Sequence, residues 1–357
     1  MKPSLLAIAI EELIKADVPA MVWGPPGTAK SQIVNQVATK IYAPEYCVTV
    51  NARTREITDA NGNTLARLPY MRDLRASTLD PTDVRGIPYI DTVNKTANWS
   101  IPSFLPQTEA GGILFLDEIN LGSPLVQASL YQLILDKQIG DYNLPRKWKI
   151  IAAGNNSADR CNVNRMTKAL ENRLCHLEIE IDSNDWEKHA LKTGFELPVI
   201  LYARFRPANL YAFDPTKQDK AFATLRSWER VSDFLKVNPP DTILYDVIKG
   251  LIGDAIAAEF CGFLKIYKNL PNIKSMIANA KTCNLDYDTD VKFALCGALG
   301  KQADYTNIGA IVTLADRLGE EFGTLLMVVV SSEKPELRET KSFIEWSIRN
   351  QNVTFNN

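Results

Sequence analysis

The chain is poor in the residues that build metal centres and disulfide frameworks. It has only two histidines, His176 and His189, and its six cysteines include no C-x-x-C pair. This spacing does not fit a structural zinc site. Scattered cysteines are typical of reduced thiols, so we expect a cytoplasmic protein.

Strong net charge and long apolar runs are also missing. A formal net charge of -2 over 357 residues gives no global attraction to a phosphate backbone, so a nucleic-acid partner is the less favoured expectation. No stretch reaches the roughly 18 uninterrupted apolar residues that a membrane span needs. With 46% hydrophobic and 23% charged residues, we expect a globular protein with a sizeable core and no membrane partner.

The first half of the chain alternates short apolar runs with helical patterns. Runs rich in Val, Ile and Leu predict strands at 19–24, 46–50, 112–118, 149–155 and 175–181. Strands separated by helices favour a parallel sheet covered by helices, which is the α/β class. After about residue 185 the apolar residues recur at helical spacing, so the second half is predicted to be helical.

A phosphate site is predicted where a strand leads into a glycine turn and a helix, in VWGPPGTAKS at 22–31. This is the context that the P-loop motif requires, and its backbone N–H groups and helix start bind phosphate oxygens. Lys30 would reach the β- and γ-phosphates of ATP, and the Ser31 hydroxyl would bind Mg²⁺. The alternative is a chance Gly-Pro turn before a helix. The predicted binding residues are Gly24, Pro25, Pro26, Gly27, Thr28, Ala29, Lys30 and Ser31.

Ala29 stands where the common G-x-x-x-x-G-K-[ST] pattern has its second glycine. Alanine is tolerable there if the residue has negative φ at the start of the helix, where it is favoured over glycine by roughly 1 kcal/mol. On this argument, the fit of alanine to the motif depends on a negative φ at Ala29.

Two adjacent carboxylates follow the apolar run ILFLDEIN at 113–120. Asp117 at the end of such a strand can hold Mg²⁺, and Glu118 can orient and deprotonate the attacking water. The alternative is an ordinary helix cap. With the P-loop upstream, the pair predicts ATP and Mg²⁺ as cofactors, with Ser31 and Asp117 as metal ligands.

These motifs, GPPGTAKS with Ala before the lysine, LDEIN and LRSW, resemble those of the AAA+ ATPases and, within them, the MoxR-like group. The resemblance extends from about residue 18 to about residue 235. It implies an AAA+ P-loop nucleotide-binding domain with a parallel sheet over 1–184, a helical lid over 185–270 and a helical C-terminal segment over 271–357. It also implies Mg²⁺-dependent ATP hydrolysis.

The resemblance supplies further catalytic residues beside Glu118. IIAAGNN looks like the sensor 1 strand, which assigns Asn155, with Asn156 as a neighbour for the same role. KALENRL looks like the segment that presents an arginine finger, here Arg173, to the nucleotide of the next subunit. TLRSWERV looks like sensor 2 on the lid, which assigns Arg226.

Each of these assignments has a structural alternative. Asn155 would be an ordinary loop residue after a strand, and Arg173 a cation near a helix C-terminus. Arg226 would pair with Glu229 or face solvent. Two further arginines, Arg160 and Arg165, compete with Arg173 for the role of finger.

The partners follow from the same resemblance. We expect a homo-oligomeric ring, a hexamer, that acts as a chaperone on a protein client, with a von Willebrand factor A domain protein as the candidate partner. Segments 77–91 and 99–106 look like an insertion facing the ring pore, and 135–150 looks like the hairpin before sensor 1. Tyr89, Asp91 and Tyr142 are candidate client contacts, the alternative being ordinary surface hairpins.

Two other functions stay open. A nucleic-acid motor would need a basic groove, for which Arg146, Lys147 and Lys149 form the candidate cluster, although the net charge argues against it. A nucleotide-gated assembly switch with little turnover has small need of a general base, and Glu118 beside Asp117 argues against that function.

Overall fold

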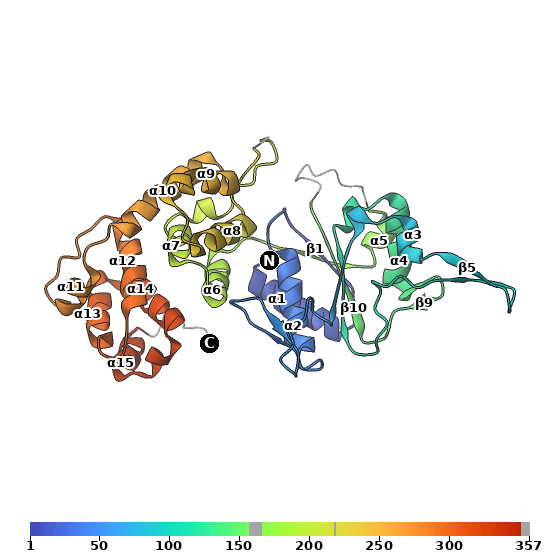
Figure 1. The fold of residues 1–357 in the computed structure, drawn as a ribbon, viewed down its shortest axis with the longest axis horizontal. Helices are drawn as coiled ribbons and strands as arrows, with labels where there is room; N and C mark the ends of the chain where they lie inside the picture. Colours follow the sequence, from blue (N-terminus) through green and yellow to red (C-terminus); the bar gives the residue numbers. More distant parts are fainter. Residues whose placement is uncertain (157–165, 218, 351–357) are drawn as a thin grey trace. The chain divides into compact units, whose positions relative to one another are not determined.

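The computed structural model describes residues 1–156, 166–217 and 219–350. The chain divides into two compact units. The first comprises Met1–Asp185 with Asp214–Lys217, and the second comprises Trp186–Phe213 with the described residues from 219 onward. Figure 1 shows the elements of each unit.

The first unit is built on a five-stranded parallel sheet. Its strands lie in the order β11-β1-β10-β7-β4. Because the strands are parallel, their carboxyl ends meet at one edge of the sheet, where β1, β7 and β10 lead into the predicted motifs. The strands are β1 (Ala20–Trp23), β4 (Met71–Arg75), β7 (Gly112–Asp117), β10 (Trp148–Gly154) and β11 (Cys175–Glu178).

Helices cover both faces of this sheet, which explains the continuous apolar runs of its strands. On β7, Ile113 and Phe115 join the core cluster formed with α1 (Pro3–Lys15) and α2 (Lys30–Tyr42). Leu114 and Leu116 of the same strand join the opposite cluster. All four are 0% exposed, and burying each contributes about 1.5–3 kcal/mol.

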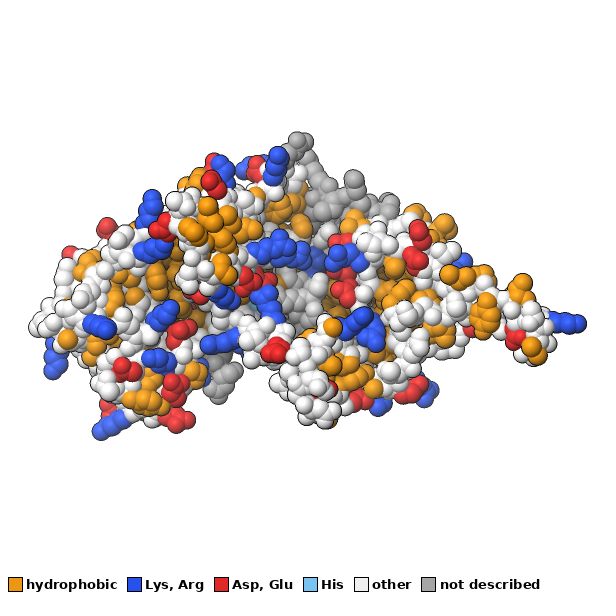
Figure 2. Space-filling view, viewed as in Figure 1, with side chains coloured by type: hydrophobic (Ala, Val, Ile, Leu, Met, Phe, Trp, Pro, Cys, Tyr) orange, Lys and Arg blue, Asp and Glu red, His pale blue; other side chains and the backbone are white. Residues whose placement is uncertain are grey.

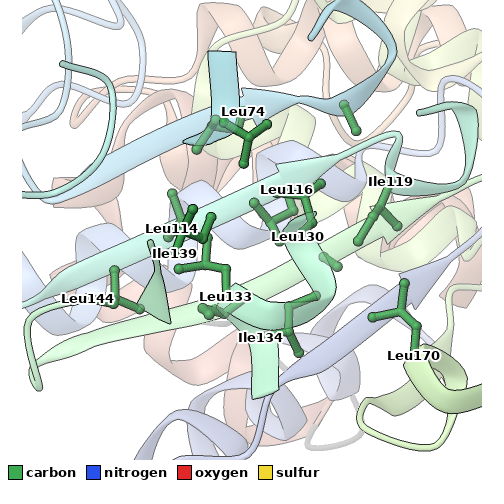
Figure 3. Packing of buried hydrophobic residues seen from close by; sticks show 14 of the residues in the cluster. Leu74, Leu114, Leu116, Ile119, Leu130, Leu133, Ile134, Ile139, Leu144 and Leu170 are labelled. Atoms are coloured by element: carbon green, nitrogen blue, oxygen red, sulfur yellow. The ribbon is translucent and has the colours of Figure 1, made fainter. Parts of the chain in front are cut away.

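The second core cluster lies between the sheet and α4 (Pro124–Asp136), with α3 (Pro81–Arg85) packed beside α4. Figure 3 shows Leu130 and Leu133 of α4 close to Leu114 and Leu116 of β7. Ser123 caps α4 by accepting a hydrogen bond from the Val126 N–H. This packing fixes the strand that ends in the two adjacent carboxylates.

The strand predicted at 46–50 does not belong to the main sheet. Only Thr49–Val50 (β2) is extended, and it pairs antiparallel with β3 (Ile57–Thr58). The place beside β7 is taken by β4, an edge strand in which only Met71 and Leu74 are buried. An edge strand lacks a continuous apolar run, so its sequence carries a weak signal. The other four predicted strands are confirmed.

Two hairpins extend the first unit. One joins β5 (Pro88–Asp91) to β6 (Thr96–Trp99), and the other joins β8 (Gln138–Ile139) to β9 (Tyr142–Asn143). The second confirms the hairpin predicted within 135–150. Hydrophobic side chains gather along the β5–β6 hairpin in Figure 2, where Ile90 is 78% and Val93 87% exposed. Short elements complete the unit: η1 (Ala76–Thr78), η2 (Ile119–Leu121) and α5 (Lys168–Glu171).

All the secondary-structure elements among the described residues of the second unit are helices, as predicted. Its core contains an aromatic cluster, in which the Tyr202 ring lies 5.6 Å from that of Trp228 and 5.1 Å from that of Phe260. None of the helices in the described ranges is long and apolar enough to cross a membrane. After α6 (Ser183–Thr193), which begins in the first unit, the helices are α7 (Leu197–Phe205), η4 (Pro207–Leu210), α8 (Leu225–Lys236), α9 (Asp241–Ile252), α10 (Asp254–Lys268), α11 (Ile273–Ala278), α12 (Thr289–Gln302), α13 (Ile308–Leu318), α14 (Glu320–Glu333), η5 (Pro335–Glu339) and α15 (Lys341–Arg349).

The predicted fold class is therefore confirmed. The chain has an α/β domain with a parallel sheet covered by helices, followed by a helical C-terminal part.

Candidate nucleotide site

The glycine-rich loop connects β1 to α2 and is held by its own contacts. Gly27 has a φ of 77°, a conformation that glycine adopts without strain. The Thr28 hydroxyl donates to the Pro25 carbonyl at 2.8 Å, and Thr28 is 1% exposed. The Gly24 N–H donates to the Gly154 carbonyl of β10 at 3.4 Å. The loop is thus attached to two neighbouring strands.

The Lys30 ammonium group lies inside this loop. Its Nζ donates to the carbonyls of Gly24 at 2.7 Å and Pro25 at 3.0 Å. It also donates to Oδ1 of Asn155 at 3.0 Å. Asn155 directly follows β10, so the parallel sheet brings together two predicted site residues that are far apart in the sequence. The same ammonium would be shared between the loop and a bound phosphate.

Ser31 and Asp117 form the candidate Mg²⁺ site. The Ser31 hydroxyl donates to Oδ2 of Asp117 at 3.3 Å. Asp117 is the last residue of β7 and only 9% exposed, and its Oδ1 accepts the Glu118 N–H at 3.0 Å. A hydroxyl and a carboxylate are oxygen ligands of the kind that Mg²⁺ prefers. The residues present therefore fit this metal.

Glu118 adopts a left-handed backbone, with φ 53° and ψ 37°. Its Oε2 accepts a hydrogen bond from the Ser77 hydroxyl at 2.5 Å and lies 4.0 Å from the Arg75 guanidinium. Ser77 and Arg75 were not found from the sequence, because only the pairing of β4 with β7 places them beside Glu118.

The carboxylates at this edge of the sheet repel one another electrostatically. Desolvation and the negative charge of Asp117 raise the pKa of Asp73 on β4, with a further contribution from Glu118 and an opposing one from Arg75. A surplus of negative charge here favours a bound cation.

The structure does not meet the condition under which the sequence argument tolerates Ala29. Ala29 has φ 64° and ψ 23°, the left-handed region, rather than a negative φ. It is the N-cap of α2, since its carbonyl accepts the Ile33 N–H at 3.0 Å while its own dihedrals are not helical. Helix propensity does not act on a residue outside the helix. For alanine this conformation costs roughly 1–2 kcal/mol.

The predicted arginines take no part in the hydrogen bonds and ion pairs described above for the first unit. Arg173 follows α5 in the first unit, is exposed, and forms no ion pair with a described residue. Arg226 is the second residue of α8 in the second unit, is exposed, and likewise has no ion pair in the described ranges. Thr224 caps that helix by accepting the Ser227 N–H at 3.1 Å. Arg160 and Arg165 lie outside the described residues.

Two of the candidate client contacts have structural roles instead. Tyr142 is 6% exposed and its hydroxyl donates to the Pro106 carbonyl at 2.6 Å, so it belongs to the core. Asp91 closes the β5–β6 turn, where hydrogen bonds from the backbone and side chain of Asn94 and from the Val93 N–H lower its pKa. Tyr89 is 53% exposed and remains a surface residue.

The basic cluster considered for nucleic acid is partly neutralised. Lys149 binds Asp17 at 2.9 Å, and Lys147 lies 3.3 Å from Glu45. Desolvation tends to raise the pKa of Asp17, but hydrogen bonds from Lys137 and Lys149 outweigh it and lower that pKa. These pairs reduce the positive charge available to a phosphate backbone.

No model of a protein family and no curated protein matches the chain. Among solved structures, it is similar to the RuvB Holliday junction branch migration motor of Thermotoga maritima, at 17% identity and a TM-score of 0.39 over 83% of this chain and 80% of that chain. It is also similar to NtrX of Brucella abortus in complex with ADP, at 14% identity and a TM-score of 0.37 over 98% of this chain and 67% of that chain. At these identities and scores, the likeness establishes nothing about the activity or partners of this chain.

Proposed function

We propose that the chain is a Mg²⁺-dependent ATPase of the AAA+ superfamily, of the MoxR-like group, that works as a ring on a protein client. The observation that carries the proposal is the contact between the Ser31 hydroxyl and Asp117, next to Lys30 inside the loop. These residues supply a phosphate ligand and two metal ligands within one small site.

The chain's own groups account for nucleotide binding. The first turn of α2 offers N–H groups and a partial positive charge to phosphate oxygens. Lys30 shares its ammonium group between the loop and those oxygens. Ser31 and Asp117 would hold Mg²⁺, which would stabilise negative charge in the transition state. Asn155, already bonded to Lys30, is placed to hydrogen-bond the γ-phosphate or the attacking water.

Glu118 is the proposed general base. Its Oε2 accepts a hydrogen bond from the Ser77 hydroxyl, which restrains the side chain, while Oε1 can accept a proton from water. The substitution Glu118→Gln keeps the size of the side chain but removes the base. ATP binding should persist while the turnover number falls by about a hundredfold or more.

The test compares ATP affinity by equilibrium binding with phosphate release at saturating ATP. Glu109→Gln, an exposed glutamate with no described contact, is the matched control and should retain wild-type turnover. Normal turnover in Glu118→Gln would remove Glu118 from the mechanism.

Arg173 is the proposed finger acting on the neighbouring subunit, and Arg226 the proposed sensor on the helical lid. The exposed position of Arg173 supports a role toward a second chain. Mixing Arg173→Ala subunits with Lys30→Ala subunits should restore part of the ATPase activity, because some interfaces then contain one intact site. If no mixing ratio restored activity, Arg173 would not be the finger that acts in trans, and Arg160 or Arg165 would become the candidate.

The β5–β6 hairpin is the proposed client-contacting element. Tyr89, Ile90 and Val93 present apolar surface on a hairpin that also carries Asp91 and Lys95, and exposed apolar side chains suit contact with an unfolded or partly folded polypeptide. With the Glu118→Gln variant held in ATP, a client should co-purify, a von Willebrand factor A domain protein being the candidate. Replacing Ile90 and Val93 by serine should abolish that capture and leave basal ATPase activity unchanged, whereas undiminished capture would contradict the assignment.

A further inference from the structure

Asn120 is the last residue of the ILFLDEIN segment and contacts Asn155 of the candidate site, but no role has been assigned to it above. It belongs to the short turn η2, two residues after Glu118, and is only 3% exposed. Its Nδ2 donates to the backbone carbonyl of Asn155 at 2.7 Å. Because a carbonyl only accepts, this contact sets the orientation of the Asn120 amide.

The other half of this amide is unpaired. Oδ1 of Asn120 is buried and has no hydrogen-bond partner among the described residues. A buried acceptor without a donor is destabilising, so stability alone does not explain an asparagine here. We therefore look for the role of Asn120 in its Nδ2 group, which donates to the Asn155 carbonyl.

The fit against β10 is close. A Cβ built on Gly154 would lie 2.6 Å from Oδ1 of Asn120 and 2.6 Å from Cε of Met21, so a larger residue there would require the ends of both side chains to shift. The next residue is Asn155, whose carbonyl Asn120 holds and whose side chain accepts from Lys30. Asn120 thus restrains the backbone that aims the Asn155 amide.

The turn also links Asn120 to the general base. The Leu121 N–H donates to the Glu118 carbonyl at 2.8 Å, which closes the turn that contains both Glu118 and Asn120. A displacement of this turn would therefore also move the backbone of Asn155, because the Asn120 amide is hydrogen-bonded to the Asn155 carbonyl.

We propose that Asn120 is a positioning residue that sets the place of the Asn155 side chain relative to Glu118 and Lys30. The proposal rests on the ATPase function proposed above. It requires that the effect of Asn120 on turnover pass through the Asn155 amide.

A double-mutant cycle on the turnover number tests this coupling. Asn120→Ala should lower kcat by about five- to tenfold in the wild-type background, with less change in KM for ATP. In the Asn155→Ala background the same substitution should lower kcat by less than about twofold, because the group it positions is absent. If Asn120→Ala does not fold, Asn120→Cys, of similar volume and without a strong donor, replaces it in the cycle.

Gln127 of α4 provides the matched control. It is a buried amide, 3% exposed, that donates to the Gly122 carbonyl at 3.1 Å and has no described hydrogen bond to Asn155. Gln127→Ala should change kcat by the same factor in both backgrounds.

Equal losses from Asn120→Ala in the two backgrounds, or no loss in either, would overturn the positioning role. A wild-type chain without ATPase activity would instead refute the proposed function. An active wild type whose Asn155→Ala variant keeps full kcat would refute the role of Asn155, and with it the positioning role of Asn120.

Discussion

Replacing Ala29 by glycine should stabilise the protein. The left-handed backbone of Ala29, φ 64°, costs an alanine roughly 1–2 kcal/mol and a glycine nothing. Glycine also raises the conformational entropy of the unfolded chain, which lowers the free energy of unfolding by about 0.4–1 kcal/mol relative to alanine. The net gain is about 0–1.6 kcal/mol, and its midpoint of about 0.8 kcal/mol raises Tm by about 1.5–3 °C for a unit of 150–250 residues.

Calorimetry of the full chain without nucleotide measures this shift. If Ala29 instead had the negative φ on which the sequence argument depends, glycine would cost about 1 kcal/mol and lower Tm. The sign of the change therefore decides between the two conformations, and a lower Tm would refute the reasoning. Ala16→Gly is the control, since Ala16 is exposed with φ -79°, and glycine should lower Tm there.

Further predictions concern the base and the cysteines. Ser77→Ala removes a hydrogen bond to the Glu118 carboxylate and should raise basal kcat about threefold, measured as phosphate release at saturating ATP. Unchanged or lower kcat would show that Ser77 does not restrain the base. Burial raises the pKa of Cys296 to about 12, so iodoacetamide at pH 8 should alkylate exposed Cys47 and leave Cys296 unmodified in the folded chain. Mass spectrometry checks this, and labelled Cys296 would contradict its burial.

Much of the candidate site could be predicted because its parts are contiguous in the sequence. The strand, turn and helix around Lys30 and Ser31 occupy one short segment, and Asp117 with Glu118 directly follow a buried strand. Strands buried on both faces carry an unbroken apolar run, so β7 and β10 were evident. The roles assigned to Arg173 and Arg226 stay predictions, because they concern contacts outside the described first unit.

Other features required contacts between distant segments. The edge strand β4 has only one buried face, and its place beside β7 alone brings Ser77 to Glu118. Tyr142 looked like a surface residue of a hairpin, but the fold buries its ring and pairs its hydroxyl with Pro106.

The sequence by itself determined the class of the fold, the helical second half and the residue types that can hold phosphate and Mg²⁺, since these depend on local periodicity and short motifs. Only the tertiary structure decided the order of the strands, the left-handed backbone of Ala29 and the contact of Asn120 with Asn155. Those features arise where the carboxyl ends of β1, β7 and β10 converge, and the free energy that selects such an arrangement comes from packing between segments far apart in the chain.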